Sequence, residues 1–190
     1  MNLREDQKYN LTSSENEAWI VGRGYGATTL LSEAMKEVTS VGGNVLLVCP
    51  IGSCLKYTGQ PLPVKQGIYP LGNGSVTYIK GFMNVDPNEF DLILIDHIFH
   101  LDIHHQFHKW RDLTISNTKV ILAGTPSEGN IETGSLEINA FVKREVDCFY
   151  KVHSGSTFHN TGLPESFLKC VLEERSSCVS RFKRETLGIC

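Results

Sequence analysis

Five short apolar runs recur along the chain, each bounded by polar or turn-forming residues, at positions 18–21, 45–49, 76–79, 92–95 and 120–123. Four of them are continuous rather than alternating, which is typical of strands buried on both faces of a parallel sheet. The run at 76–79 alternates and is expected nearer the edge of the sheet. The pattern therefore predicts five strands of a mainly parallel sheet.

Helical patterns lie between these runs, at 27–39 and at about 98–112. The first follows the 3.6-residue period of a buried stripe, formed by Ala27, Leu30, Leu31, Ala34, Met35 and Val38. Strands that alternate with helices predict an α/β fold with a mainly parallel sheet and helices on both faces.

The remaining segments are less regular. Residues 56–74 hold three prolines and four glycines, and we expect a loop there that ends in a tight turn at Asn73 and Gly74. A strand is expected near 148–152, followed by a polar loop. Pro164 then begins a helix, whose apolar face would comprise Phe167, Leu168, Val171 and Leu172.

The chain has 190 residues and a formal charge of −3, which suits one domain with a substantial core. No apolar run approaches the length of a membrane span, and the polar N-terminus does not resemble a signal peptide. The mild acidity argues against indiscriminate nucleic-acid binding, although 181–185 form a local basic strip. The six cysteines contain no C-x-x-C pair, so free thiols in a reducing compartment are expected.

The segment 18–29, AWIVGRGYGATT, combines a strand, a glycine loop and a helix start. In this context backbone N–H groups and a helix N-terminus hold phosphates. Compared with G-x-x-x-x-G-K-[ST], Gly26 and Thr28 fit, whereas Val21 replaces the first glycine and Ala27 replaces the lysine. The predicted phosphate-binding residues are Gly22, Arg23, Gly24, Tyr25, Gly26, Ala27, Thr28 and Thr29.

Four of the apolar runs end in polar or turn residues, namely Gly22, Pro50, Asp96 and Gly124–Thr125. Ligands in parallel sheets bind outside the carboxyl ends of the strands. We therefore expect these four tips to face one crevice.

Asp96 at such a tip is a candidate Mg²⁺ ligand together with the Thr28 hydroxyl, and the alternative for Asp96 is a helix N-cap. In nucleotide hydrolases a carboxylate that orients the attacking water commonly follows the metal-binding aspartate. His97 occupies that position in this sequence. Arg23 either replaces the missing lysine or is a surface side chain. Thr125, followed by Pro126, either senses the γ-phosphate or simply ends a strand.

Five histidines cluster at His97, His100, His104, His105 and His108. On one continuous helix His100, His104 and His108 would share a face at a spacing that binds Zn²⁺ or Ni²⁺. A solvated helix face is the commoner explanation of such a pattern.

The order of these motifs resembles the ATPase domain of the large terminase subunit, the DNA-packaging motor of tailed bacteriophages. The resemblance is carried by GRGYGATT (22–29), NVLLVCP (44–50), NGSVTYIKG (73–81), FDLILIDH (90–97), KVILAGTPSEGN (119–130), FHNTGLPESFLKCVLEE (158–174) and RETLGIC (184–190). It covers nearly the whole chain from about residue 18.

This resemblance implies a RecA-like, ASCE-type P-loop ATPase that uses ATP and Mg²⁺. Residues 1–145 would form the core and 146–190 a small C-terminal lid. The family assembles as a ring on a viral portal, with a small terminase subunit, and pumps double-stranded DNA in the host cytoplasm. By the same resemblance Gln7 is a candidate adenine contact, and Arg111 or Arg144 a candidate arginine offered in trans.

Two departures from the family pattern concern the catalytic side chains, since Ala27 replaces the lysine and His97 replaces the glutamate. The sequence also stops where the family's nuclease domain would begin, and an excised domain, a split gene and a stand-alone paralogue all remain open. The alternative function is therefore a catalytically inactive pseudo-ATPase that serves as a structural or interaction module.

Overall fold

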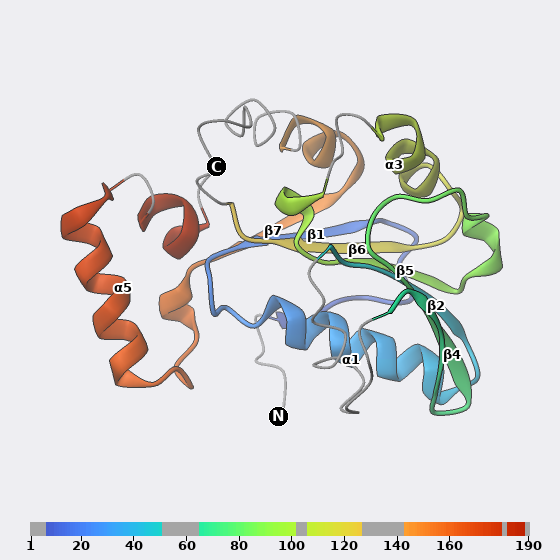
Figure 1. The fold of residues 1–190 in the computed structure, drawn as a ribbon, viewed down its shortest axis with the longest axis horizontal. Coiled ribbons are helices and arrows are strands. Elements are labelled where there is room, and N and C mark those ends of the chain that lie inside the picture. Colours follow the sequence, from blue (N-terminus) through green and yellow to red (C-terminus); the bar gives the residue numbers. More distant parts are fainter. Residues whose placement is uncertain (1–6, 51–64, 102–105, 127–142, 180–181, 189–190) are drawn as a thin grey trace.

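The computed structural model describes residues 7–50, 65–101, 106–126, 143–179 and 182–188. At its centre lies a seven-stranded sheet in the order β3–β4–β2–β5–β6–β1–β7 (Figure 1). All neighbouring strands are parallel except β3 and β4. The predicted mainly parallel α/β sheet is therefore confirmed.

The five apolar runs of the sequence all become strands. They are β1 (Glu17–Val21), β2 (Asn44–Val48), β4 (Gly74–Ile79), β5 (Leu92–Ile95) and β6 (Val120–Gly124). Every residue of β1, β5 and β6 is buried, as expected for strands covered on both faces.

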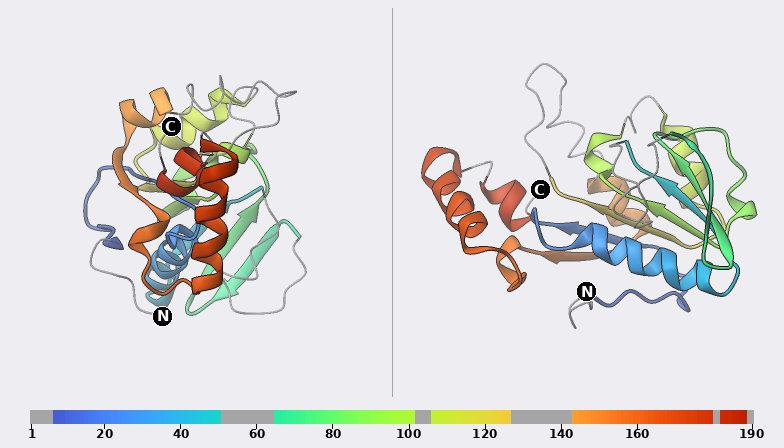
Figure 2. Two further views of the ribbon diagram at one scale, coloured as in Figure 1. Left: turned by 90° about the vertical axis from the view of Figure 1, so that its left-hand side faces the viewer. Right: turned by 60° about the horizontal axis from the view of Figure 1, so that its bottom comes forward.

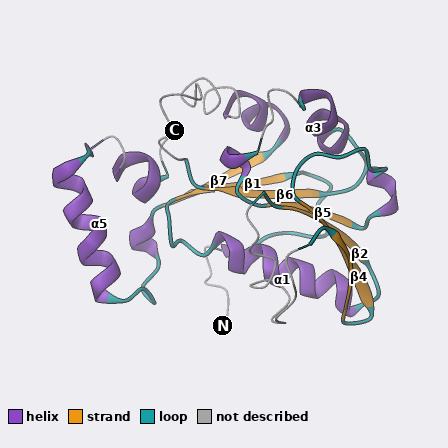
Figure 3. Ribbon diagram, in the orientation of Figure 1, coloured by secondary structure: helices purple, strands orange, loops and turns teal. Residues whose placement is uncertain are grey.

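Helices cover both faces of this sheet (Figure 3). On one face lies α1 (Ala27–Ser40), which buries Leu30, Leu31 and Met35 against the sheet. The opposite face carries the short 3₁₀ turn η3 (Ile98–His100), α3 (Phe107–Thr114) and a helix at 143–149. Each face of the sheet thus has its own apolar core, and Trp110 of α3 is fully buried in the core on this second face.

The strand order places β6 between β1 and β5, with Ile20 opposite Gly124 and Leu122 opposite Ile95. The loop after β1, the residues after β6 and Asp96 after β5 therefore lie at one edge of the sheet. Position 124 favours glycine in this arrangement, because a Cβ there would lie 2.6 Å from Ile98 Cγ2 of η3. The predicted meeting of the four tips at one edge is confirmed by the topology, because β2, which Pro50 follows, is the parallel neighbour of β5.

One strand lies where we predicted a loop. β3 (Gly67–Leu71) pairs antiparallel with β4 across the turn at Gly72 and Asn73. Pro70 lacks an N–H and is tolerated because β3 is the edge strand, so the proline count of this segment was misleading. Residues 56–64 of the predicted loop lie outside the described residues.

The C-terminal third also departs from the prediction. The strand expected near 148–152 is β7 (Lys151–Gly155), because residues 143–149 are helical and Tyr150 N–H still bonds to Val146 O. The turn η5 (Thr157–His159) follows, then α5 (Glu165–Ser177), which begins after Pro164 as predicted, and η6 (Phe182–Thr186). On α5 Val171 is buried, whereas Leu172 is half exposed.

The helix predicted over 98–112 is wrong. After η3 the backbone at Leu101 is extended, and α3 begins only at Phe107. A further 3₁₀ turn, η2 (Pro87–Glu89), precedes β5. The break at Leu101 rules out one helix face that carries both His100 and His108.

A buried charge cluster lies at the amino ends of β1 and β6, opposite the edge of the strand tips. Lys119 Nζ is 2.9 Å from Glu17 Oε1, and His153 Nε2 is 3.2 Å from Glu17 Oε2. The Glu17 and Lys119 side chains are 4% and 8% exposed. Burial would raise the pKa of Glu17, but the hydrogen bonds from His153 and Lys119 hold it at about 2.

Within the described residues no disulfide links Cys49, Cys148, Cys170 or Cys178, in line with the predicted thiols, and Cys54 and Cys190 lie outside the described residues. Among the helices that the structure describes, none has the length and apolarity needed to cross a membrane.

Candidate functional site

The glycine loop runs from the end of β1 into α1. Gly24 and Gly26 have φ angles of 78° and 108°, which residues with a side chain rarely adopt. Leu30 N–H bonds to Gly26 O at 3.0 Å, so the helix begins directly at the end of the loop. The N–H groups of a first helical turn have no acceptor inside the helix, which is the property that a phosphate site uses.

C-terminal residues hold the loop from outside. Gly22 N–H bonds to Gly155 O at 2.7 Å, and Asn160 Nδ2 donates to Gly24 O at 2.6 Å. A Cβ on Gly22 would lie 2.1 Å from Thr186 O, so only glycine allows this approach. Figures 1 and 2 show α5 and η6 beyond the end of the sheet where β1 passes into α1.

The predicted loop residue Arg23 is tied to the same C-terminal segment. Its guanidinium lies 3.3 Å from the Glu185 carboxylate and 6.0 Å from the centre of the Phe167 ring. Its backbone N–H also bonds to Glu185 O. The side chain is 37% exposed. In this conformation Arg23 is paired with a carboxylate, which sequence reasoning did not foresee.

The two candidate metal ligands are brought together. Thr28 Oγ1 donates to Asp96 Oδ2 at 3.1 Å, although the two residues lie 68 positions apart. Asp96 is 2% exposed. Ala27 stands at the first position of α1, where the sequence pattern expects lysine, and Thr29 follows in the same turn.

His97 folds back onto Asp96. Its N–H donates to Asp96 Oδ1 at 2.8 Å, and its Nε2 lies 3.5 Å from Asp96 Oδ2. The backbone of His97 is left-handed, with φ 56° and ψ 46°, and among the described residues it is the one positive-φ position that is not glycine. Such strained positions concentrate at functional sites.

Cys49 completes a cluster with Asp96 and His97 that sequence reasoning missed. It follows β2, the neighbour of β5, and is fully buried. The thiol, carboxylate and imidazole ligand atoms all lie within 4.8 Å of one another. The signal available in the sequence was that two adjacent buried strands end in Cys49 and Asp96.

Thr125 and Pro126 follow β6 directly, between the glycine loop and Asp96 in the strand order. This position is compatible with the predicted sensor role. The remainder of that predicted segment, 127–130, lies outside the described residues.

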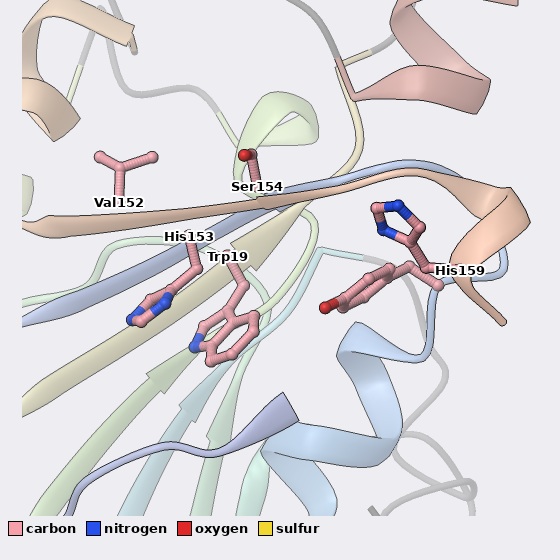
Figure 4. Close-up of a pocket in the computed structure, with 6 residues that line it drawn as sticks. Trp19, Val152, His153, Ser154 and His159 are labelled. Carbon is pink, nitrogen blue, oxygen red and sulfur yellow. The ribbon is translucent and has the colours of Figure 1, made fainter. Parts of the chain in front are cut away.

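A pocket of about 490 Å³ lies beside β7, where His153 and Trp19 point toward the α1 side and Val152 and Ser154 point to the other side of the strand (Figure 4). Its lining residues are Trp19, Tyr25, Val152, His153, Ser154 and His159. The rings of Trp19 and His153 stack at 4.2 Å. Gln7 is buried under the loop, where its Nε2 donates to Tyr25 O at 2.9 Å.

The predicted histidine face is not formed. His100 lies in η3, His108 lies in α3, and His104 and His105 are outside the described residues. The His97 and His100 rings are 5.9 Å apart. Burial, and secondarily the charge of His97, lowers the pKa of His100.

The two candidate trans arginines lie on the α3 face of the sheet, on α3 and on the helix at 143–149. Arg111 on α3 lies over the rings of Phe107 and Phe149. The Arg144 side chain is 69% exposed and pairs with Glu145.

No family model and no curated protein matches the sequence. Solved structures of similar fold include large terminases. That of the thermophilic bacteriophage D6E has a TM-score of 0.61 at 8% identity, over 100% of this chain and 54% of its own. The large terminase of bacteriophage HK97 has a TM-score of 0.59 at 14% identity, over 100% of this chain and 51% of its own. The large terminase ATPase domain of Thermus phage P74-26 has a TM-score of 0.56 at 11% identity, over 93% of this chain and 88% of its own.

This chain therefore spans about half the length of the D6E and HK97 proteins and most of the P74-26 ATPase domain. Its fold is that of the terminase large-subunit ATPase domain, as the sequence resemblance indicated. The D6E protein has also been solved in complex with ADP and with ATP-γ-S.

Proposed function

We propose that this chain is a terminase-type ATPase domain that binds ATP with Mg²⁺ at the glycine loop and drives or regulates DNA packaging. The single observation that carries the proposal is the contact between Thr28 and Asp96 beside a glycine loop that begins a helix. The fold shared with large terminases supports the same assignment.

The chemistry of this pair suits Mg²⁺, which prefers oxygen ligands and is usually held by one or two protein groups together with substrate phosphates. Thr28 and Asp96 would hold the ion, and residues 22–29 would hold the phosphates through backbone N–H groups. Bound there, Mg²⁺ would neutralise phosphate charge. The His97 imidazole lies 3.5 Å from the Asp96 carboxylate, and imidazole is a common general base in enzymes.

The pocket beside Tyr25 is our proposed seat for the nucleobase. It lies on the flank of the loop and offers aromatic surfaces that suit stacking. Gln7, which the sequence suggested as an adenine contact, would then support the pocket through its bond to the Tyr25 carbonyl.

A catalytically inactive pseudo-ATPase is the second candidate, and one observation favours it. Arg23, the cation of the glycine loop, is paired with Glu185, and Ala27 supplies no charge. Slow or partner-dependent hydrolysis is expected if Arg23 exchanges Glu185 for the phosphates.

The assembly we propose follows the same analogy. Residues 1–145 would be the core and 146–190 the lid. Partners would be double-stranded DNA, a viral portal, a small terminase subunit and further copies in a ring, together with a nuclease domain or subunit, in the host cytoplasm. Arg111 or Arg144 would be offered in trans.

Calorimetric titration of the chain with a non-hydrolysable ATP analogue tests the proposal. We expect Mg²⁺-dependent binding that Thr28→Ala weakens by roughly tenfold, the lower end of the effect of disturbing a metal's support. Thr77→Ala, in β4, is the matched control. Absence of binding at millimolar nucleotide would contradict the proposal and leave a purely structural role.

Replacing Glu185 with glutamine tests the role of Arg23. Release of the ion pair is expected to tighten nucleotide binding by up to about fivefold, because an ion pair with one partly exposed partner is worth about 1 kcal/mol. Glu165→Gln at the start of α5 is the control. Unchanged affinity in the same titration would mean that Arg23 does not take the place of the lysine.

A further inference from the structure

Two adjacent strand tips bring a thiol, a carboxylate and an imidazole together at the candidate site. Cys49 comes from the end of β2, and Asp96 and His97 come from the end of β5, its parallel neighbour. Their ligand atoms lie within 4.8 Å of one another, and His97 Nε2 is 3.5 Å from Asp96 Oδ2. Two of the three residues are buried.

We propose that Cys49, Asp96 and His97 form a binding site for a transition-metal dication, with Zn²⁺ as the best fit, and that this ion binds without nucleotide. Thiolate and imidazole donors select Zn²⁺ and similar ions, whereas Mg²⁺ takes oxygen ligands. This inference rests on the proposed function in one respect: the Zn²⁺ site shares Asp96 with the proposed site of the nucleotide's Mg²⁺.

The separations between the ligand atoms are of the order that a tetrahedral centre needs. With bonds of about 2.0 Å to nitrogen and oxygen and about 2.3 Å to sulfur, ligand atoms lie roughly 3.3 to 3.6 Å apart. The imidazole and the carboxylate already have this separation, so only a small movement of the Cys49 side chain is needed. On binding, the thiol proton passes to solvent and the thiolate coordinates the ion.

The three ligands are held by their surroundings. The Cys49 backbone is fixed on both sides, since its N–H bonds to Ile79 O at 2.9 Å and its carbonyl accepts from Tyr78 Oη at 3.1 Å. The Asp96 carboxylate accepts from His97 N–H and from Thr28 Oγ1. The left-handed backbone of His97 turns its ring back toward the carboxylate.

The metal site is thus different from the one that the histidine spacing suggested. His97 belongs to both sets, but its partners come from another strand and not from a helix face. The fourth coordination position of such a site would be open to water or to a phosphate oxygen.

The test uses the full chain, stripped with EDTA and kept reduced, with Zn²⁺ or Co²⁺ alone. We expect one Zn²⁺ per chain in competition with a chromophoric chelator, and Co²⁺ should give a sulfur-to-metal charge-transfer band. Cys49→Ser should abolish that band and weaken Zn²⁺ binding at least about tenfold, and His97→Gln should weaken it similarly.

Cys148→Ser and His108→Gln are matched controls on other elements, and both should leave Zn²⁺ affinity unchanged. Circular dichroism establishes that each variant is folded, and Asp96→Asn provides a third ligand variant. A missing charge-transfer band, or equal binding in Cys49→Ser, would overturn the inference. Mg²⁺-dependent nucleotide binding, titrated separately, would survive that result, so the two proposals fail independently.

Discussion

Replacing Ala27 with lysine is expected to raise the rate of ATP hydrolysis about a hundredfold or more. One preorganised group aimed at developing charge is worth about 10²–10³ in rate. Ala27 is the first residue of α1, so a lysine there would extend from the end of the glycine loop. Phosphate release at saturating ATP and Mg²⁺ measures the effect.

Ala27→Gln separates charge from side-chain length and should give little gain. A lysine at a helix N-terminus opposes the helix dipole by about 0.3–1 kcal/mol, so a small loss of stability is compatible with the gain in rate. If lysine raises neither the rate nor the nucleotide affinity above the glutamine variant, the loop is not a phosphate site. If lysine raises the nucleotide affinity but not the rate of ATP hydrolysis, the remaining catalytic defect lies at His97.

Replacing Lys119 with methionine is expected to destabilise the chain by about 3–5 kcal/mol, because it leaves the buried Glu17 carboxylate without its cation. Lys119 Nζ also donates to the carbonyls of Ser13 and Glu15, and these bonds would be lost as well. For a chain of this length the melting temperature should fall by roughly 6 to 20 °C. Thermal unfolding followed by circular dichroism measures it.

Lys36→Met is the matched control, because Lys36 pairs with Glu33 on an exposed face of α1. Exposed pairs of this kind contribute about 0–1 kcal/mol. The double variant Glu17→Gln with Lys119→Met should be more stable than Lys119→Met alone. Equal destabilisation of the two would show that charge burial at Glu17 is not the cause.

The same cluster makes stability depend on pH. The pKa of Glu17 is held at about 2 in the folded chain against an ordinary value of 4.5. Its contribution is therefore complete above about pH 5 and is lost as the pH falls toward 2. Glu17→Gln should flatten that part of the unfolding curve, measured in urea at successive pH values.

The sequence determined most of the strands and the glycine loop that leads into α1. Continuous apolar runs and the 3.6-residue stripe are local patterns, and they set β1, β5, β6 and α1 with small errors at the ends. It also determined that Thr28 meets Asp96, because parallel strands present their carboxyl ends at one edge. Whether this edge binds nucleotide remains a prediction.

Only the tertiary structure decided which groups modify that site. Arg23 pairs with Glu185, and Cys49 faces His97, through contacts between elements far apart in the chain, which leave no local periodic signal. The expected histidine face failed for the converse reason, since a spacing of four is informative only on a continuous helix and Leu101 is extended. Local pattern fixes what each segment becomes, and packing decides which side chains then meet.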